Sequence, residues 1–443
     1  RQVWRYLFLL VFISGCAGLS VSQLQKKFGP AAPVERTITE LGSEQVDYWS
    51  DVEPVLARRC VVCHACFDAP CQLKLTAIEG VERGGSKDNV YNLSRPLAAD
   101  PSRLEQDAAS VHAWREAGFH PVLNEYQQSP LVNQGASLMY QLLSLKESQP
   151  FAINQPLPKT VPVGIKRENV CPKIEEYPDY VKDHPEWGMP YGLPPLAASE
   201  SLPIKQWLTE GAQYTPRPPV DSQLQKEIDQ WETFLNKPSL KTQLMSRYLY
   251  EHLFLANLHF SDYGQAVFFR LVRSKTPPGE PVELIATRRP YDDPGVARVY
   301  YRLVPQIELP AYKNHMPYAL NAERMANWMR WFLLAEYSVK ALPGYEPKQA
   351  ANPFYTFAQI PSKSRYQFLL DEAQYTIMTF IKGPVCRGQV AVNVIRDHFW
   401  VFFVAPETLD AVGMDQFLAN NYQDFQMPNA DGDIFLPMVA WGK

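Results

Sequence analysis

The chain has 443 residues, of which 46% are hydrophobic and 20% are charged, and its formal net charge at pH 7 is −4. This length is enough for two or three domains with their own cores, and the slightly acidic balance argues against a nucleic-acid-binding protein. The 39 prolines outnumber the 22 glycines, which favours stiff, extended connections over a compact all-helical bundle.

Residues 1–20 have the pattern of an export signal. Two arginines precede an apolar run that is too short to cross a bilayer comfortably. The small residues Ser14 and Gly15 come directly before Cys16, as in a bacterial lipoprotein box, where the cysteine thiol receives lipid after cleavage. We therefore predict export to the bacterial periplasm and a lipid anchor on Cys16. A plain export signal and an uncleaved membrane anchor are the alternatives.

Four cysteines and one histidine fall between residues 60 and 71. Among them, Cys60, Cys63 and His64 form the C-x-x-C-H pattern of haem c attachment. Two thiols at this spacing bond to one porphyrin edge, and the adjacent histidine ligates the iron. A redox-active C-x-x-C pair is one alternative, and a zinc site completed by Cys66 and Cys71 is another. The motif predicts a covalent haem c with His64 as an iron ligand.

Helices are predicted on both sides of this motif in the chain. Residues 47–60, just before it, place Trp49, Val52, Val55 and Leu56 on one helical face. Residues 201–213 predict a second short helix, with Ile204, Trp207 and Leu208 facing inward and Gly211 at the C-terminal cap. This order of elements is typical of cytochromes c, so we predict an all-α, cytochrome c-like haem domain over residues 45–213.

Met189 is the predicted sixth iron ligand. It lies in the segment WGMPYGLPPL, residues 187–196, where prolines favour an extended backbone that can present a thioether to the iron. A structural methionine is the first alternative. Other possible donors are His112, His120 and His184, although a lone histidine is more often a structural residue.

His64 and Met189 are much further apart in the chain than a minimal cytochrome requires, which predicts an insertion over about residues 75–185. Helical patches are expected within it at residues 101–118 and 136–148. Such an insertion can build a substrate pocket beside the haem or a docking surface.

Three further cysteines, Cys66, Cys71 and Cys171, are not needed for haem. In an oxidising compartment they can form one disulfide and leave one thiol. Both a Cys66–Cys71 and a Cys71–Cys171 pair are possible, and sequence spacing does not choose between them.

Residues 214–220, YTPRPPV, have the composition of a linker. Residues 221–443 predict an α+β domain, so the chain as a whole has a mixed fold. Its expected helices cover residues 221–236, 240–258 and 322–340, and its expected strands cover residues 266–273, 282–290 and 298–306, with a further strand that ends in Phe399–Val404. No P-loop and no G-x-G-x-x-G motif occurs in the sequence.

Two groups in this half are weaker candidates for chemistry. His252 and His259 are seven residues apart, as on one helical face, and indicate either a second haem or metal site or, more simply, a buried face. The side chains of Arg288, Arg289 and Arg302 could bind a carboxylate or phosphate head group, and solvated strand faces explain them equally well.

The segments RRCVVCHACFDAPCQLKL, residues 58–75, and IKGPVCRGQVAVNVIRDHFWVFF, residues 381–403, resemble the bacterial fatty acid cis/trans isomerase family. The resemblance implies a periplasmic haem c enzyme that converts cis double bonds of unsaturated fatty acids, free or in phospholipid acyl chains, to trans. It implies no use of NAD(P)H or ATP. It also implies a disulfide at Cys66 and Cys71, and a longer C-terminal region than this sequence has.

The resemblance further implies how the reaction proceeds. The iron bound at Cys60, Cys63 and His64 would withdraw π electron density from the double bond, which permits rotation. Since trans chains pack more tightly, the reaction would stiffen the membrane under stress, and the enzyme would act at the membrane surface. The alternatives are a periplasmic electron-transfer cytochrome with an appended partner-binding domain, and a non-catalytic haem sensor or envelope lipoprotein.

Overall fold

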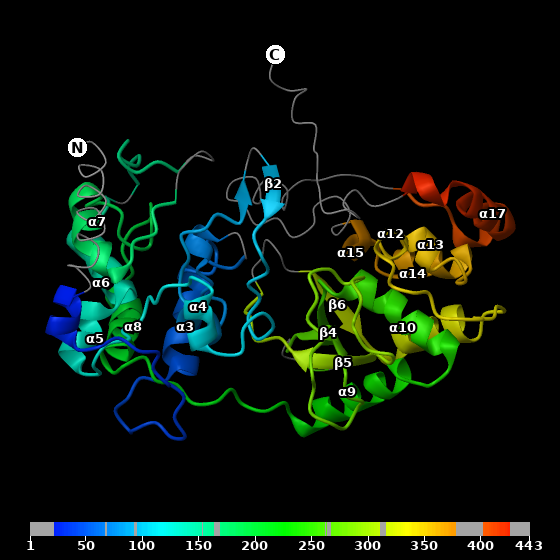
Figure 1. The fold of residues 1–443 in the computed structure, drawn as a ribbon, viewed down its shortest axis with the longest axis horizontal. Coiled ribbons are helices and arrows are strands. Elements are labelled where there is room, and N and C mark those ends of the chain that lie inside the picture. Colours follow the sequence, from blue (N-terminus) through cyan, green and yellow to red (C-terminus); the bar gives the residue numbers. More distant parts are fainter. Residues whose placement is uncertain are drawn as a thin grey trace, which may run out of the picture. The chain divides into compact units, whose positions relative to one another are not determined.

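The structure is a computed structural model, shown in Figure 1. It describes residues 22–66, 69–92, 95–152, 154–163, 169–261, 263, 267–310, 316–377 and 402–425. The chain divides into two compact units: the first comprises Arg1–Asn89 and Ser102–Pro218, and the second comprises Val90–Pro101 and Pro219–Lys443. The division falls within the Pro-rich segment 214–220. Residues 90–101, which we had placed in the haem domain, belong to the second unit.

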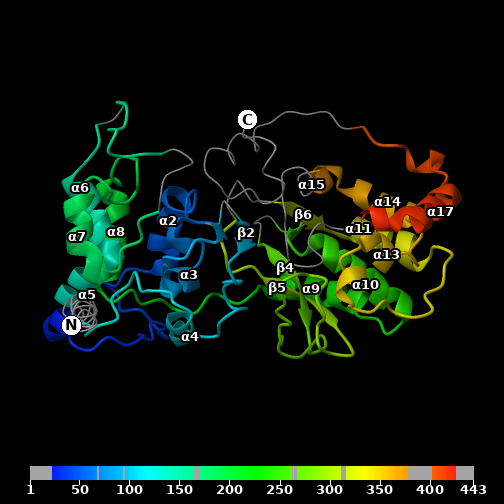
Figure 2. The same ribbon diagram turned by 45° about the horizontal axis from the view of Figure 1, so that its top comes forward.

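The first unit is largely helical where the structure describes it. Its helices are η1 (Tyr48–Val52), α2 (Glu53–Arg59), η2 (Pro70–Gln72), α3 (Ile78–Arg83), α4 (Val111–Glu116), α5 (Pro130–Ala136), α6 (Leu138–Ser148), η3 (Ile174–Glu176), α7 (Tyr177–Asp183) and α8 (Ala198–Thr209). Helix α8 contacts α5, α6 and η1, and α5 to α8 lie together in both views (Figures 1 and 2). A shared apolar core holds these helices, with Tyr48, Val52, Leu56, Ile204 and Trp207 fully buried.

The helices predicted around the C-x-x-C-H motif are present, with altered bounds. The first is divided into η1 and α2, and Val52, Val55 and Leu56 are buried as predicted. The second, α8, buries Ile204, Trp207 and Leu208, also as predicted. Gly211 follows its end with φ +95°, a value that favours glycine. The helical patch at residues 101–118 is reduced to α4, and the patch at residues 136–148 is α6.

The second unit contains a four-stranded sheet in the order β5-β4-β3-β6. Its strands are β3 (Asn257–Phe260), β4 (Phe269–Ser274), β5 (Tyr300–Pro305) and β6 (Pro317–Leu320). β3 pairs with β6 in parallel, and the other pairs are antiparallel. A short antiparallel pair, β1 (Tyr91–Asn92) and β2 (Arg95–Ala98), also belongs to this unit.

Helices complete the described part of the second unit. They are α9 (Ser222–Leu235), α10 (Leu240–Leu253), α11 (Ala322–Trp328), η4 (Met329–Leu333), α12 (Pro347–Ala350), α13 (Pro353–Thr356), α14 (Ser362–Asp371), α15 (Ala373–Ile377), η6 (Pro406–Thr408), α17 (Ala411–Asn421) and η7 (Tyr422–Phe425). α9 packs against β5 and α10 packs against β4. The core between them includes Trp231, Leu249, Phe269 and Trp328.

Two predicted helices of this unit end earlier than expected, and one predicted strand is not formed. The helix predicted over residues 240–258 ends at Leu253, because residues 257–260 pair on both sides as β3. The strand predicted over residues 282–290 is reduced to one bridge, Ser274↔Leu284, since this segment folds around the Arg273 guanidinium. The helix predicted over residues 322–340 ends at Leu333.

The strand predicted to end in Phe399–Val404 lies mostly outside the described residues, and residues 402–404 form no strand. Cys16, like the whole segment 1–20, also lies outside them. Within the part of the chain that the structure describes, we find no helix with the length and apolarity that crossing a membrane requires.

Candidate haem-attachment site

The C-x-x-C-H motif forms a tight turn at the end of α2. Cys60 N donates to Leu56 O over 2.9 Å, which continues the helical pattern beyond Arg59. Cys63 N and His64 N then both donate to Cys60 O, over 3.1 and 3.0 Å. Because one carbonyl accepts both bonds, the two cysteines and the histidine are held together on a single turn, as the sequence predicts.

Cys60 and Cys63 are both free thiols. Cys60 packs against the apolar core of the first unit, whereas Cys63 is exposed. Burial, and then the neighbouring Cys63, raises the pKa of the Cys60 thiol to about 12. The attacking thiol of a redox-active C-x-x-C pair has a depressed pKa, so the environment of Cys60 disfavours this cysteine in that role.

His64 is oriented by a backbone carbonyl. Its Nδ1 atom lies 3.0 Å from Leu73 O, and Leu75 N donates to His64 O over 2.9 Å. Because a carbonyl oxygen can only accept a hydrogen bond, Nδ1 carries the proton. The lone pair of the imidazole is then on Nε2, and this tautomer is the one that ligates iron through Nε2.

The disulfides differ from one of the predicted pairings. Cys71 bonds to Cys171, with the two Cα atoms 5.6 Å apart. Cys66 is also disulfide-bonded, so it neither pairs with Cys71 nor remains as a leftover thiol. The Cys66–Cys71 bridge is thus wrong, because Cys71 is already bonded to a cysteine far along the chain.

This pairing also bears on the zinc alternative, which needed Cys66 and Cys71 as thiolate ligands. Both sulfurs are in disulfides, and a disulfide sulfur cannot serve as a thiolate. Among the described residues, no three His, Cys, Asp or Glu side chains form a group that could hold a metal ion by themselves.

Met189 comes from a separate loop that is fixed on α6. Its backbone N donates to Leu142 O over 2.9 Å, and its side chain is half-buried. The preceding Gly188 lies against the backbone of Lys146 so closely that a Cβ atom would clash with it. The loop position is thus set by main-chain contacts with α6, and the Met189–iron bond stays a prediction.

Each alternative histidine has a local structural environment. His112 is exposed and lies 3.5 Å from the Glu116 carboxylate in α4. The His184 ring stacks on Trp187 with the ring centroids 4.0 Å apart. His120 is buried, and burial together with Lys173 and Lys87 lowers its pKa to about 4.

The weaker candidates of the second unit do not form a site. His252 is in α10, and its Nδ1 atom donates to Tyr248 O over 2.7 Å, but His259 is in β3. The two histidines are therefore not on one helical face, because the helix ends between them. Among the three arginines, Arg288 is half-exposed and pairs with Asp100.

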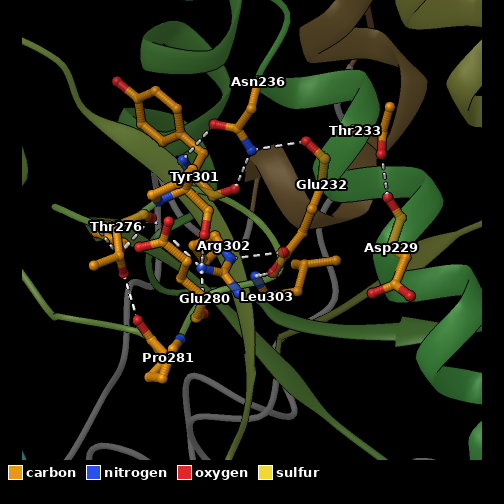
Figure 3. Close-up of polar contacts among 12 residues, drawn as sticks. Asp229, Glu232, Thr233, Asn236, Thr276, Glu280, Pro281, Tyr301, Arg302 and Leu303 are labelled. Atoms are coloured by element: carbon orange, nitrogen blue, oxygen red, sulfur yellow. Dashed lines mark hydrogen bonds and ion pairs between the residues drawn. The ribbon is translucent and has the colours of Figure 1, made fainter.

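Arg302 is committed to the interior of the second unit (Figure 3). Its Nε atom donates to Glu232 of α9 over 2.6 Å, and its Nη1 atom donates to Pro277 O over 2.7 Å. Glu232 also accepts from Leu303 N over 2.8 Å. Because both charged side chains are almost fully buried, Arg302 joins a helix to a strand and is not available to a head group.

The role of the Leu73 carbonyl could not be predicted from the sequence, because every residue has a main-chain acceptor whatever its side chain.

An apolar groove of about 560 Å³ between α6 and α7 was also not predicted from the sequence. The groove is lined by Ser144, Leu145, Ser148, Tyr177, Pro178 and Val181.

A helical unit that presents two free thiols and an oriented imidazole on one turn has the features of a candidate haem c protein. The comparison with known families goes further: the family model described as fatty acid cis/trans isomerase (CTI) matches residues 99–443. The chain belongs to the fatty acid cis/trans isomerase family, which confirms the resemblance, and it is an isomerase whose substrates are unsaturated fatty acids.

The matched segment begins after the C-x-x-C-H motif, so family membership rests on residues outside it. No curated protein and no solved structure matches the chain.

Proposed function

We propose that this isomerase uses a covalently bound haem c, attached through Cys60 and Cys63 and ligated by His64. The observation that carries the proposal is the contact between His64 Nδ1 and Leu73 O, because it selects the imidazole tautomer that iron requires. The state of the cysteines adds support: the two motif thiols are free, whereas Cys66, Cys71 and Cys171 are in disulfides.

Rotation about a carbon–carbon double bond is blocked by its π electrons. Haem bound at this site would supply an iron that can withdraw electron density from the double bond and so lower the barrier to rotation. Neither ATP nor NAD(P)H is needed, since the reaction changes neither the oxidation state nor the position of the bond. The protein contributes the thiols that fix the ring, the imidazole that ligates iron and a surface that orients the acyl chain.

Met189 is proposed as the second residue that would hold the haem iron in the resting enzyme. The support is its placement in a loop that main-chain contacts fix on α6. A permanent Met189 bond would leave no iron position for the substrate. Whether Met189 would hold the iron throughout turnover therefore decides how closely the double bond could approach the iron.

The groove between α6 and α7 is proposed to hold the acyl chain. Leu145, Tyr177 and Val181 give it an apolar lining that suits a hydrocarbon. Helix α6, which forms one of its walls, also holds the Met189 loop through Leu142. Leu142 and Cys60 pack against the same apolar core. Helix α6 therefore forms a wall of the proposed acyl groove and also positions the loop of the proposed iron ligand.

We further propose a periplasmic, membrane-associated enzyme with a lipid anchor on Cys16. The support is the sequence pattern of residues 1–20 and the disulfides at Cys66, Cys71 and Cys171, since disulfides form and persist in oxidising compartments. The fatty acyl substrate itself resides in membranes, which makes the membrane surface the place of reaction.

The proposed function is tested by incubating the full, haem-loaded protein with a cis-monounsaturated fatty acid and separating the products by gas chromatography. The expected product is the trans isomer with its double bond at the original position. No trans product from the holoprotein would overturn the proposal. A positional isomer would also overturn it, because bond migration requires proton transfer rather than rotation.

A further inference from the structure

Two consecutive residues before the Leu73 carbonyl have an uncommon backbone conformation. Cys71 has φ +57° and Gln72 has φ +49°, both in the left-handed region where a Cβ atom crowds the neighbouring carbonyl. Side-chain-bearing residues stay in this region only where surrounding contacts hold them. The strained pair leads directly into Leu73, whose carbonyl accepts from His64 Nδ1.

Arg83, the last residue of α3, contacts this turn from the protein interior. It is fully buried, and its two terminal nitrogens donate to Gln72 O and Ser102 O. Its Cζ atom lies 4.7 Å from the Phe119 ring centroid and 5.5 Å from that of Trp114. A buried guanidinium is costly unless hydrogen-bonded, so Gln72 O is a strong acceptor partner that resists displacement.

Other contacts fix the same turn and the position of α3. Ser86 N donates to Cys71 O over 2.7 Å, and the Gln72 side chain donates to Asp88 O over 2.9 Å. Arg115 donates to Arg83 O over 2.7 Å and pairs with the Glu125 carboxylate. The peptide between Gln72 and Leu73 is therefore held from several sides, with Arg83 as the charged group that contacts it directly.

We propose that Arg83 is a positioning residue for His64: by fixing the Gln72–Leu73 peptide, it holds the Leu73 carbonyl at hydrogen-bonding distance from Nδ1. This inference rests on the proposed haem function. A carbonyl that accepts from Nδ1 makes the imidazole a more basic ligand, and a more basic axial ligand stabilises ferric over ferrous iron. Loosening the turn weakens this bond and raises the haem reduction potential.

The test compares Arg83→Lys with Arg36→Lys in the full holoprotein. Arg36 is a matched control: it is equally buried in the first unit and donates to two carbonyls, Gly211 O and Asn124 O, each over 2.6 Å. The readout is the reduction potential from a spectroscopic redox titration. We expect Arg83→Lys to shift the ferric–ferrous equilibrium about tenfold toward ferrous iron, about 59 mV for one electron, and Arg36→Lys to leave it unchanged.

A milder variant, Phe119→Leu, keeps Arg83 but removes one of its aromatic neighbours, and it should raise the potential by a smaller amount. It also serves if Arg83→Lys does not fold. The positioning role of Arg83 is overturned if the folded Arg83→Lys protein has the wild-type reduction potential. If only Phe119→Leu folds, a wild-type potential in that variant has the same meaning. An equal shift of the potential in Arg36→Lys also overturns the role. If the wild type contains no covalent haem, the proposed function itself fails, which the pyridine haemochrome spectrum shows separately.

Discussion

The Nδ1 atom of His64 lies 3.0 Å from the carbonyl oxygen of Leu73, and this contact determines which imidazole nitrogen can ligate iron. His64→Ala should keep haem bound through Cys60 and Cys63 but remove the axial ligand. We expect a changed visible spectrum and a decrease in trans product of more than about 100-fold. This decrease is larger than the effect of removing only a residue that hydrogen-bonds to a metal ligand. His112→Ala, an exposed substitution on α4, is the control and should retain full activity.

The second axial ligand is tested with Met189→Ala. If Met189 binds iron, the low-spin spectrum of the resting enzyme should be lost. Trans product should then persist or increase, because an iron position becomes open to the substrate. Met139→Ala in α6 controls for the loss of a methionine from the first unit. An unchanged spectrum in Met189→Ala would show that another group is the ligand.

The acyl groove is tested with Val181→Asp in α7. A carboxylate in the apolar groove between α6 and α7 opposes hydrocarbon binding, since its desolvation is not compensated there. We expect KM for the fatty acid to rise about tenfold, or about 1.4 kcal/mol of binding free energy, with kcat little changed. Lys182→Asp, at the exposed neighbouring position, should leave KM unaltered. Equal effects of the two substitutions would place the acyl chain elsewhere.

Arg302 is predicted to act in stability and not in head-group binding. Arg302→Met leaves Glu232 buried without its cation, and breaking such a pair costs about 3–5 kcal/mol of unfolding free energy. Arg288→Met removes a partly exposed ion pair with Asp100 and should cost no more than about 1 kcal/mol. Denaturant unfolding measures both values. A large stability loss confined to Arg288→Met would contradict this assignment.

His120 makes stability depend on pH. Burial, with help from Lys173 and Lys87, lowers its folded-state pKa to about 4, below the unfolded value of about 6.5. The unfolded chain thus binds the proton first, so this stabilisation is fully present above pH 6.5 and is lost as pH falls toward 4. His120→Asn should flatten the pH dependence of the unfolding midpoint in this window. A variant with the same slope as the wild type would show that His120 is accessible to protons when folded.

Much of the C-x-x-C-H segment and its flanking helices could be predicted from the sequence because both depend on local residue spacing. Cys60, Cys63 and His64 lie on one turn, and Ile204, Trp207 and Leu208 are buried on α8 as their helical periodicity predicts. Local rules of this kind act within a few residues and therefore leave a visible pattern.

What the sequence could not provide depends on partners that are distant in the chain. The helical pattern of residues 240–258 does not continue to its end, because residues 257 and 258 belong to β3, which pairs with β4 and β6. The Cys71–Cys171 pair and the Gln72 contact with Arg83 likewise depend on tertiary placement. The contact of the Leu73 carbonyl with His64 could not be predicted for another reason, because every residue has a backbone carbonyl.

If haem attached at Cys60 and Cys63 is the catalytic centre, isomerase activity must depend on haem content. Preparations of the full protein with graded haem occupancy, measured by pyridine haemochrome, are assayed for trans fatty acid by gas chromatography. We expect a rate proportional to haem occupancy, with no activity in Cys60→Ser/Cys63→Ser protein that lacks haem. Trans formation that is independent of haem content would contradict it.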